Sequence, residues 1–160
     1  SDQYSIQEIV RFAVEIEKEG YVFYKKLSER TAEKDLKNAF LNLMHDEVEH
    51  EKIFRQLLSE LGPDENEYAF HLEQEYNEYL HGIIAKTIFD ESKIDGILAG
   101  LSSAADALDY AVKREEDAAE YYRKYKAIAK PPEFPILDRI IEEEVKHKDL
   151  LLDLKKKFVK

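Results

Sequence analysis

Four long stretches of this chain carry an apolar stripe whose members are spaced alternately four and three residues apart. They span about 5–29, 33–61, 102–130 and 135–158. This spacing puts each stripe on one face of an α-helix and buries it against neighbouring helices. The sequence therefore predicts an all-α fold, an antiparallel four-helix bundle.

Helix-starting and helix-ending residues flank these stretches. Ser5 opens a Ser-Ile-Gln-Glu capping box, Gly62-Pro63 ends the second stretch, and Pro131-Pro132 separates the third from the fourth. Short connections within 5–61 and within 102–158 predict two antiparallel helix pairs. The crossover 62–101 between them is too long for a simple loop, and we expect a helix over about 65–84. We interpret residues 1–160 as a single domain.

Charged side chains interrupt every stripe near its middle. Each helix places one glutamate there, and the second and fourth helices add a histidine one turn later; the six residues are Glu17, Glu47, His50, Glu115, Glu144 and His147. Four carboxylates facing one core would be strongly destabilising, because burial disfavours each charge and the charges repel one another. Two divalent cations would remove both penalties.

The spacing of these residues suits metal ligation. Residues i and i+3 share a helix face, so Glu47 with His50, and Glu144 with His147, can each offer a carboxylate and an imidazole to one cavity. One glutamate from each of two helices plus Glu-x-x-His from the other two is typical of di-iron and di-manganese carboxylate bundles. We predict two iron ions, with manganese as the alternative and zinc as an occupant in vitro.

The two halves of the chain repeat each other. Glu17 and Glu115 are 98 residues apart, and the two histidines are 97 apart. Tyr24 and Tyr122 are also equivalent, and each is either a core aromatic with a bonded hydroxyl or a partner of a ligand carboxylate. Gly20 and Ala118 match as well, where a small residue leaves room for metal and oxidant or allows close helix packing.

Other acidic and histidine residues look ordinary. A third Glu-x-x-His, formed by Glu78 and His81, lies off the stripe of its own segment, and we interpret it as a solvated face. We expect His45 and His71 near the surface and four further glutamates in solvent: Glu49, Glu51, Glu142 and Glu143. An alternative for the six central residues is a structural polar layer that sets helix register.

Composition excludes several classes of protein. The chain has no cysteine, which rules out disulfides, thiolate metal sites and iron–sulfur clusters within it. Its formal net charge of −11 disfavours nucleic acid and anionic membranes as partners. We find no membrane-spanning run and no signal peptide, and therefore expect a cytoplasmic protein.

The stretch from Ile16 to Tyr24 and the paired Glu-x-x-His motifs resemble the rubrerythrin branch of the ferritin-like superfamily, over nearly the whole chain. The resemblance implies a ferritin-like bundle in which the six central residues are the iron ligands. Rubrerythrins usually also carry a four-cysteine rubredoxin-like site, which is missing here. They place a further glutamate where this chain has Ala118, so the centre is more symmetric and closer to the bacterioferritin pattern.

We therefore expect a redox enzyme that reduces peroxide or dioxygen. Glu47 and Glu144 would bridge the two ions, and the other four residues would be terminal ligands. Electrons would come from an external donor such as a rubredoxin-like or flavin protein, and we expect a homodimer formed through the middle segment. The alternatives are a ferroxidase or other iron-handling protein, and a non-catalytic helical interaction module.

Overall fold

The computed structural model describes residues 5–62 and 91–159, and α-helices make up most of this part of the chain. Four are long: α1 (Ile6–Glu29), α2 (Lys34–Leu61), α5 (Ala104–Ile128) and α6 (Phe134–Phe158). The predicted all-α four-helix bundle is confirmed, and each helix begins and ends within about two residues of its expected limits.

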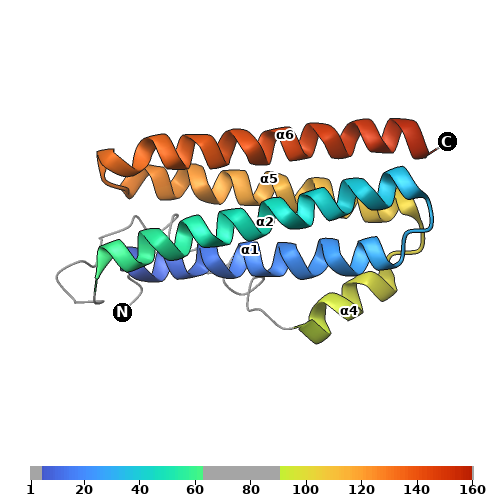
Figure 1. Cartoon of the computed structure of the whole chain (residues 1–160), viewed down its shortest axis with the longest axis horizontal. Coiled ribbons are helices and arrows are strands. Elements are labelled where there is room, and N and C mark those ends of the chain that lie inside the picture. The colour runs from blue at the N-terminus through green and yellow to red at the C-terminus, as the bar shows by residue number, and fades with distance from the viewer. Residues whose placement is uncertain (1–4, 63–90, 160) are drawn as a thin grey trace.

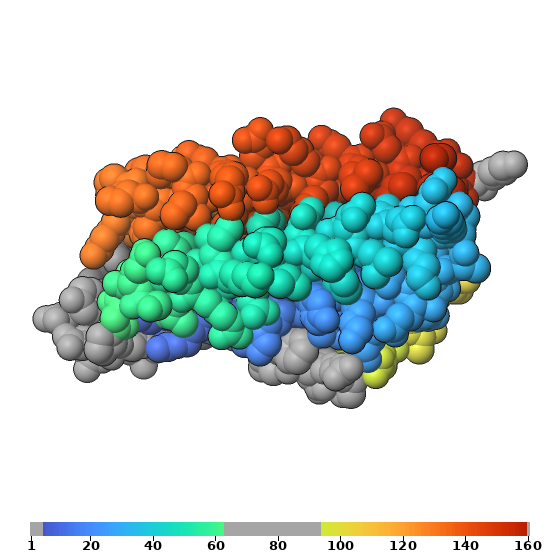
Figure 2. Space-filling view, in the orientation of Figure 1, coloured from blue at the N-terminus to red at the C-terminus, as the bar shows by residue number. Residues whose placement is uncertain are grey.

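The helices form two antiparallel pairs packed side by side. α1 pairs with α2 and α5 pairs with α6, so that α1 and α6 run in one direction while α2 and α5 run in the other (Figure 1). The space-filling view shows the surfaces of α2 and α6 adjoining along one face of the bundle (Figure 2). The opposite contact between the pairs is made by α1 and α5.

Side chains cap the starts of three long helices. The Ser5 hydroxyl accepts a hydrogen bond from the Glu8 amide at 3.1 Å, and Glu33 and Ser103 do the same for α2 and α5. A short 3-10 turn, η2 (Pro131–Glu133), leads into α6. The Tyr125 hydroxyl donates to Glu133 at 2.9 Å and so ties this turn to α5.

A further helix, α4 (Glu91–Gly100), lies at the end of the crossover and was not predicted. Its buried Ile94 and Leu98 pack against the bundle, and Lys26 of α1 pairs with Asp95 at 2.5 Å. The helix expected over 65–84 lies outside the described residues. So do His71 and the third Glu-x-x-His motif.

The apolar core has two parts, one toward each end of the bundle. One contains Ile9, Phe54 and Leu137, and the other contains Leu43 and Leu151. The six central glutamates and histidines form a polar layer between these two parts. Among the described residues, no helix has the length and apolar character needed to cross a membrane.

Candidate metal centre

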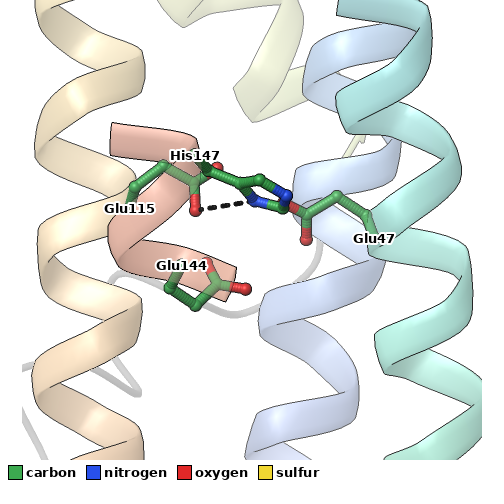
Figure 3. A group of neighbouring side chains, drawn as sticks. All are labelled: Glu47, Glu115, Glu144 and His147. Atoms are coloured by element: carbon green, nitrogen blue, oxygen red, sulfur yellow. Dashed lines mark ion pairs between the residues drawn. The ribbon is translucent and has the colours of Figure 1, made fainter. Parts of the chain in front are cut away.

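The structure brings all six predicted side chains together in the polar layer. Each is at most 6% exposed, and they come from all four long helices: Glu17, Glu47, His50, Glu115, Glu144 and His147. Their donor atoms fall into two groups, each with all its atoms within 4.8 Å of one another. Figure 3 shows the first group, Glu47, Glu115, Glu144 and His147, projecting into the space between the helices. The second contains Glu17, His50 and Glu144, so Glu144 belongs to both.

Several donor atoms of the layer have no hydrogen bond. Within the described part of the chain, these buried atoms are Glu17 Oε2, His50 Nδ1, Glu115 Oε2, Glu144 Oε1 and His147 Nδ1. Buried polar atoms are normally hydrogen-bonded. Two of these five, His50 Nδ1 and Glu144 Oε1, form an ion-pair contact at 2.8 Å, and the other three need an explanation. Carboxylate oxygens and imidazole nitrogens that converge in this way fit a metal pair, since a cation would satisfy them all at once.

Both histidines turn one ring nitrogen inward and the other outward. Nδ1 of His50 lies 2.8 Å from Glu144, and Nδ1 of His147 lies 3.6 Å from Glu115. On the outer side, Nε2 of His50 contacts Glu143, and Nε2 of His147 lies 2.9 Å from Asp46. An outer carboxylate of this kind fixes ring orientation and raises the basicity of a ligating histidine.

Two tyrosines support the other two glutamates. The Tyr24 hydroxyl donates to Glu115 Oε1 at 2.5 Å, and the Tyr122 hydroxyl donates to Glu17 Oε1 at 2.6 Å. Both rings are fully buried. Of the two interpretations that the sequence left open, the structure therefore supports a partner of the cluster carboxylates. Each hydroxyl binds one oxygen and leaves the other facing the cluster.

The four carboxyl groups differ in pKa. Burial, followed by the charge of Glu17, raises the pKa of Glu47 well above its usual value, and burial with the charge of Glu115 does the same for Glu144. Burial would also raise the pKa of Glu115, but contacts with Glu144 and His147 outweigh it and lower the pKa to about 2. Likewise, contacts with Glu47 and His50 lower the pKa of Glu17. Glu47 and Glu144 therefore hold a proton more readily than Glu17 and Glu115 do.

Both histidines are protonated at neutral pH. Burial would lower the pKa of His50, but its contacts with Glu17 and Glu143 outweigh this and raise it to about 9. Contacts with Asp46 and Glu115 likewise raise the pKa of His147 to about 9 against the effect of burial. Divalent cations would take the place of protons held by the histidines and by the carboxyl groups of raised pKa, Glu47 and Glu144.

The comparisons with known proteins agree with this geometry. A family model described as rubrerythrin matches residues 8–98, more than half of the chain. The chain belongs to the rubrerythrin family. The matched range includes Glu17, Glu47 and His50, whereas Glu115, Glu144 and His147 lie beyond it. The family and the buried carboxylate–histidine cluster together support a di-iron protein with a metal site in the polar layer.

Solved structures extend the likeness to both helix pairs. A candidate ferritin-like diiron-carboxylate protein from Thermotoga maritima is 25% identical, with a TM-score of 0.72 and 96% of each chain covered. A hypothetical protein from Pyrococcus furiosus is 24% identical, with a TM-score of 0.69, covering 96% of this chain and 89% of the other. The second likeness concerns the fold alone. Among curated proteins, none matches.

A surface pocket leads toward the polar layer of this rubrerythrin-family chain. It opens between α2 and α6, and its lining residues are Asp46, Glu49, His50, Arg139, Glu143, Lys146 and His147. The pocket includes both ligand-candidate histidines and both of their outer carboxylates. It therefore connects solvent to the outer side of the cluster.

The roles of two of these carboxylates were not predicted. We expected Glu143 to be solvated, and its side chain is 37% exposed, but it also contacts His50. Asp46 was not considered separately. Each residue directly precedes a glutamate of the cluster, and the two are equivalent in the repeat, which was the available signal. The exposed position of His45 is confirmed.

Arg114 was also missed. Its side chain is only 13% exposed and lies between α5 and α1, where Nε is 3.8 Å from Glu19 and Nη2 donates to the Ile16 carbonyl at 3.4 Å. The guanidinium also lies over the Phe23 ring, 5.5 Å from its centroid. Its equivalent in the first half is Ile16, so no comparison of the two halves predicted a charge there.

Proposed function

We propose that this chain is a di-iron carboxylate protein that reduces peroxide or dioxygen with electrons from a separate donor. The observation that carries the proposal is the convergence of carboxylate and imidazole atoms from all four helices into two groups, with Glu17 Oε2, Glu115 Oε2 and His147 Nδ1 lacking any hydrogen bond. A polar layer that only set helix register would leave fewer of its buried atoms without hydrogen bonds. The mixture of carboxylate and imidazole favours iron or manganese over calcium or magnesium.

Different residues of the chain would bind the metal, hold the ligands in place and exclude water. Bound iron would supply reversible transfer of electrons between its ferrous and ferric states to the oxidant. Glu144 belongs to both donor groups and is the natural bridge, with Glu47 as the second candidate. Tyr24 and Tyr122 hold the terminal glutamates in place, and the two apolar core regions keep bulk water from the layer.

The pocket between α2 and α6 fits the access of a small oxidant. Its lining includes Nε2-bonded histidines and ionisable side chains that can pass protons inward, which the reduction of peroxide or dioxygen requires. A rubredoxin-like or flavin protein would serve as the electron donor. The chain would assemble as a homodimer.

A second candidate is a ferroxidase that takes up and releases iron. The same pocket offers three carboxylates to an entering cation, Asp46, Glu49 and Glu143, beside the basic side chains of Arg139 and Lys146.

Loading with ferrous iron without oxygen tests the metal centre. We expect about two irons per chain by elemental analysis. A Glu47→Ala and Glu144→Ala double variant should lose them, while a control with exposed glutamates changed on the same helices, Glu60→Ala and Glu142→Ala, should keep both. Normal iron content in the first double variant would refute the assignment.

Reoxidation kinetics separate the two functions. The ferrous protein is mixed with peroxide or with dioxygen in a stopped-flow instrument, and the iron content is measured after repeated cycles. Retention of both irons over many cycles with an added reductant supports the reductase. Loss of ferric iron after each cycle supports the ferroxidase instead.

A further inference from the structure

A row of three aromatic rings runs from the polar layer to the protein surface. Its inner end is Tyr24, whose hydroxyl donates to Glu115 Oε1 at 2.5 Å. The Phe23 ring lies between Tyr24 and Tyr110, and its centroid is 5.2 Å from the centroid of each. Both separations are those of aromatic rings in contact. Tyr24 and Phe23 are buried, whereas Tyr110 on α5 is partly exposed.

The equivalent residues of the other half end differently. Tyr121 takes the place of Phe23, is only 1% exposed, and donates its hydroxyl to the Ile9 carbonyl at 2.7 Å. A peptide carbonyl is too weak a base to accept that proton. Phe12 takes the place of Tyr110 and has no hydroxyl. Of these two equivalent sets, the one that ends at Tyr110 thus places a tyrosine hydroxyl where it can lose its proton to water.

We propose that Tyr110, Phe23 and Tyr24 form a route by which an oxidising equivalent leaves the polar layer for the surface when the electron donor is absent. This inference rests on the proposed function and adds a second source of electrons to it. Electron transfer through protein slows steeply with distance, and rings in contact leave no wide gap along the row. Phe23 is not oxidised itself and only connects the two tyrosines.

The route is needed when peroxide meets a site that holds a single ferrous ion. Peroxide takes up two electrons and two protons, and it leaves as two molecules of water. One electron comes from the ferrous ion, which becomes ferric, and the protons come from solvent. Tyr24 supplies the other electron, while its hydroxyl proton moves along the hydrogen bond to Glu115 Oε1.

Tyr110 then restores Tyr24. One electron passes from Tyr110 through Phe23 to Tyr24, and Tyr24 recovers its proton from Glu115. Tyr110 releases its own hydroxyl proton to water and becomes a neutral phenoxyl radical at the surface. A one-electron reductant in solution, such as ascorbate, returns it to tyrosine with a proton from water. The ligand side chains are thereby spared oxidation.

Arg114 lies beside the row and disfavours a positive charge on its rings. The guanidinium is 5.5 Å from the Phe23 centroid, and it carries a permanent positive charge. An electron removed from Phe23 would leave a second positive charge next to it. The oxidising equivalent therefore rests on the tyrosines, which become neutral radicals by losing a proton.

Radical trapping tests the route. The protein is loaded with one ferrous ion per chain and mixed with excess peroxide and a nitroso spin trap, without an electron donor. Mass spectrometry of peptides then locates the adduct, which we expect on Tyr110. Tyr110→Phe keeps the ring but lacks the hydroxyl, so the surface adduct should be lost, while iron content and the rate of ferrous oxidation stay unchanged. Tyr21→Phe is the matched control and should keep the adduct, because Tyr21 is also partly exposed on α1 but lies outside the row.

Oxidation of the ligands gives a second readout. In Tyr110→Phe the oxidising equivalent stays at Tyr24, so repeated additions of peroxide should oxidise His50 and His147 more than in the native protein. The gain of oxygen in their peptides measures this by mass spectrometry. Ascorbate should protect the native protein more than the variant.

Three results would overturn the route while leaving the metal centre intact. They are an adduct on Tyr21, equal trapping in the native protein and in Tyr110→Phe, and no adduct although peroxide oxidises the bound iron. A protein that binds no iron would instead overturn the proposed function, and the route with it.

Discussion

The helix pairs α1–α2 and α5–α6 offer matching sets of donors but surround them differently. Both supply a glutamate on the first helix and Glu-x-x-His on the second, and both supply a tyrosine, Tyr24 or Tyr122. In each half the tyrosine binds a glutamate of the other half, and each histidine contacts an outer carboxylate of the other half. Neither pair therefore holds its own donors, and the cluster forms only where the two pairs meet.

The surroundings break this symmetry at three equivalent positions. The first half has Ile16, Gly20 and Asp46 where the second has Arg114, Ala118 and Glu143. Helix register fixes where donors lie, so both halves keep the same spacing. Size and charge next to the donors are not constrained by register, and these are the properties that differ.

The largest expected difference concerns the central glutamates. Glu144→Gln should weaken binding of both ions by more than about 100-fold, beyond the range for losing an outer partner of a ligand, because this residue serves both donor groups. Glu47→Gln should weaken binding less than Glu144→Gln, because Glu47 belongs to one donor group only. Zinc titration by calorimetry measures both. Identical losses in the two variants would show that the halves are equivalent.

The affinity for metal should depend on pH in the same way in both halves of the layer. His50 and His147 each have a pKa of about 9, and the pKa values of Glu47 and Glu144 are raised, so the metal-free layer holds protons at pH 7. Metal must displace them, and affinity should rise about tenfold per pH unit for each proton released, up to about pH 9. Calorimetry in buffers of different ionisation enthalpy measures the proton count. Affinity that does not change from pH 6 to 9 would contradict these protonation states.

In the metal-free protein, a rise in pH should lower stability, whereas it raises the affinity for metal. A histidine whose pKa is raised by folding stabilises the protein below its unfolded value of about 6.5. That contribution is lost as pH rises toward about 9, where the folded histidines release their protons. The metal-free protein should therefore melt at lower temperature at pH 9 than at pH 6.5. Since the pKa of both histidines is raised, each should contribute a similar part of this fall in melting temperature.

The ion pairs beside the layer should differ in their effect on stability. Arg114→Met leaves the Glu19 carboxylate, only 12% exposed, without its partner and should lower the free energy of unfolding by about 3 kcal/mol. The control is Asp117, the repeat equivalent of Glu19. It pairs with Lys113 at the surface, and Asp117→Asn should lower the free energy by less than about 0.5 kcal/mol. Urea unfolding of the metal-free variants measures both, and equal losses would refute the distinction.

The smallest expected effect comes from the outer carboxylates. Asp46→Asn and Glu143→Gln should each weaken metal binding about tenfold, through the histidine of the opposite half. Combining Asp46→Asn with His147→Ala should add no further loss, whereas combining it with His50→Ala should. The reverse pattern would mean that each carboxylate acts within its own half.

Most of the fold could be predicted because it depends on periodicity. The four-and-three spacing located the long helices, and Ser5 and Pro131 marked two of their limits. Helix α4 was missed because it is short, contains Gly96 and Gly100, and buries only Ile94 and Leu98 in its described part. Two buried apolar residues are too few to define a helical periodicity in the sequence.

In the candidate site, too, the residues on the apolar stripes could be predicted and the others could not. Its six members interrupt apolar stripes, and a charge in a stripe is visible in sequence. Asp46, Glu143 and Arg114 lie outside the stripes, and their partners come from other helices, so their roles depend on the distance between helices. Gly20 was noticed, but whether it gave room to a ligand or to a neighbouring helix could be decided only from the position of Glu47.

Anomalous scattering at the iron edge from a crystal of the iron-loaded protein tests the central claim most directly. We expect two iron peaks in the polar layer, one beside His147 and one beside His50, with Glu144 between them. Peaks only at surface carboxylates, or a polar layer without anomalous signal in protein that contains iron, would contradict a di-iron centre built from these six residues.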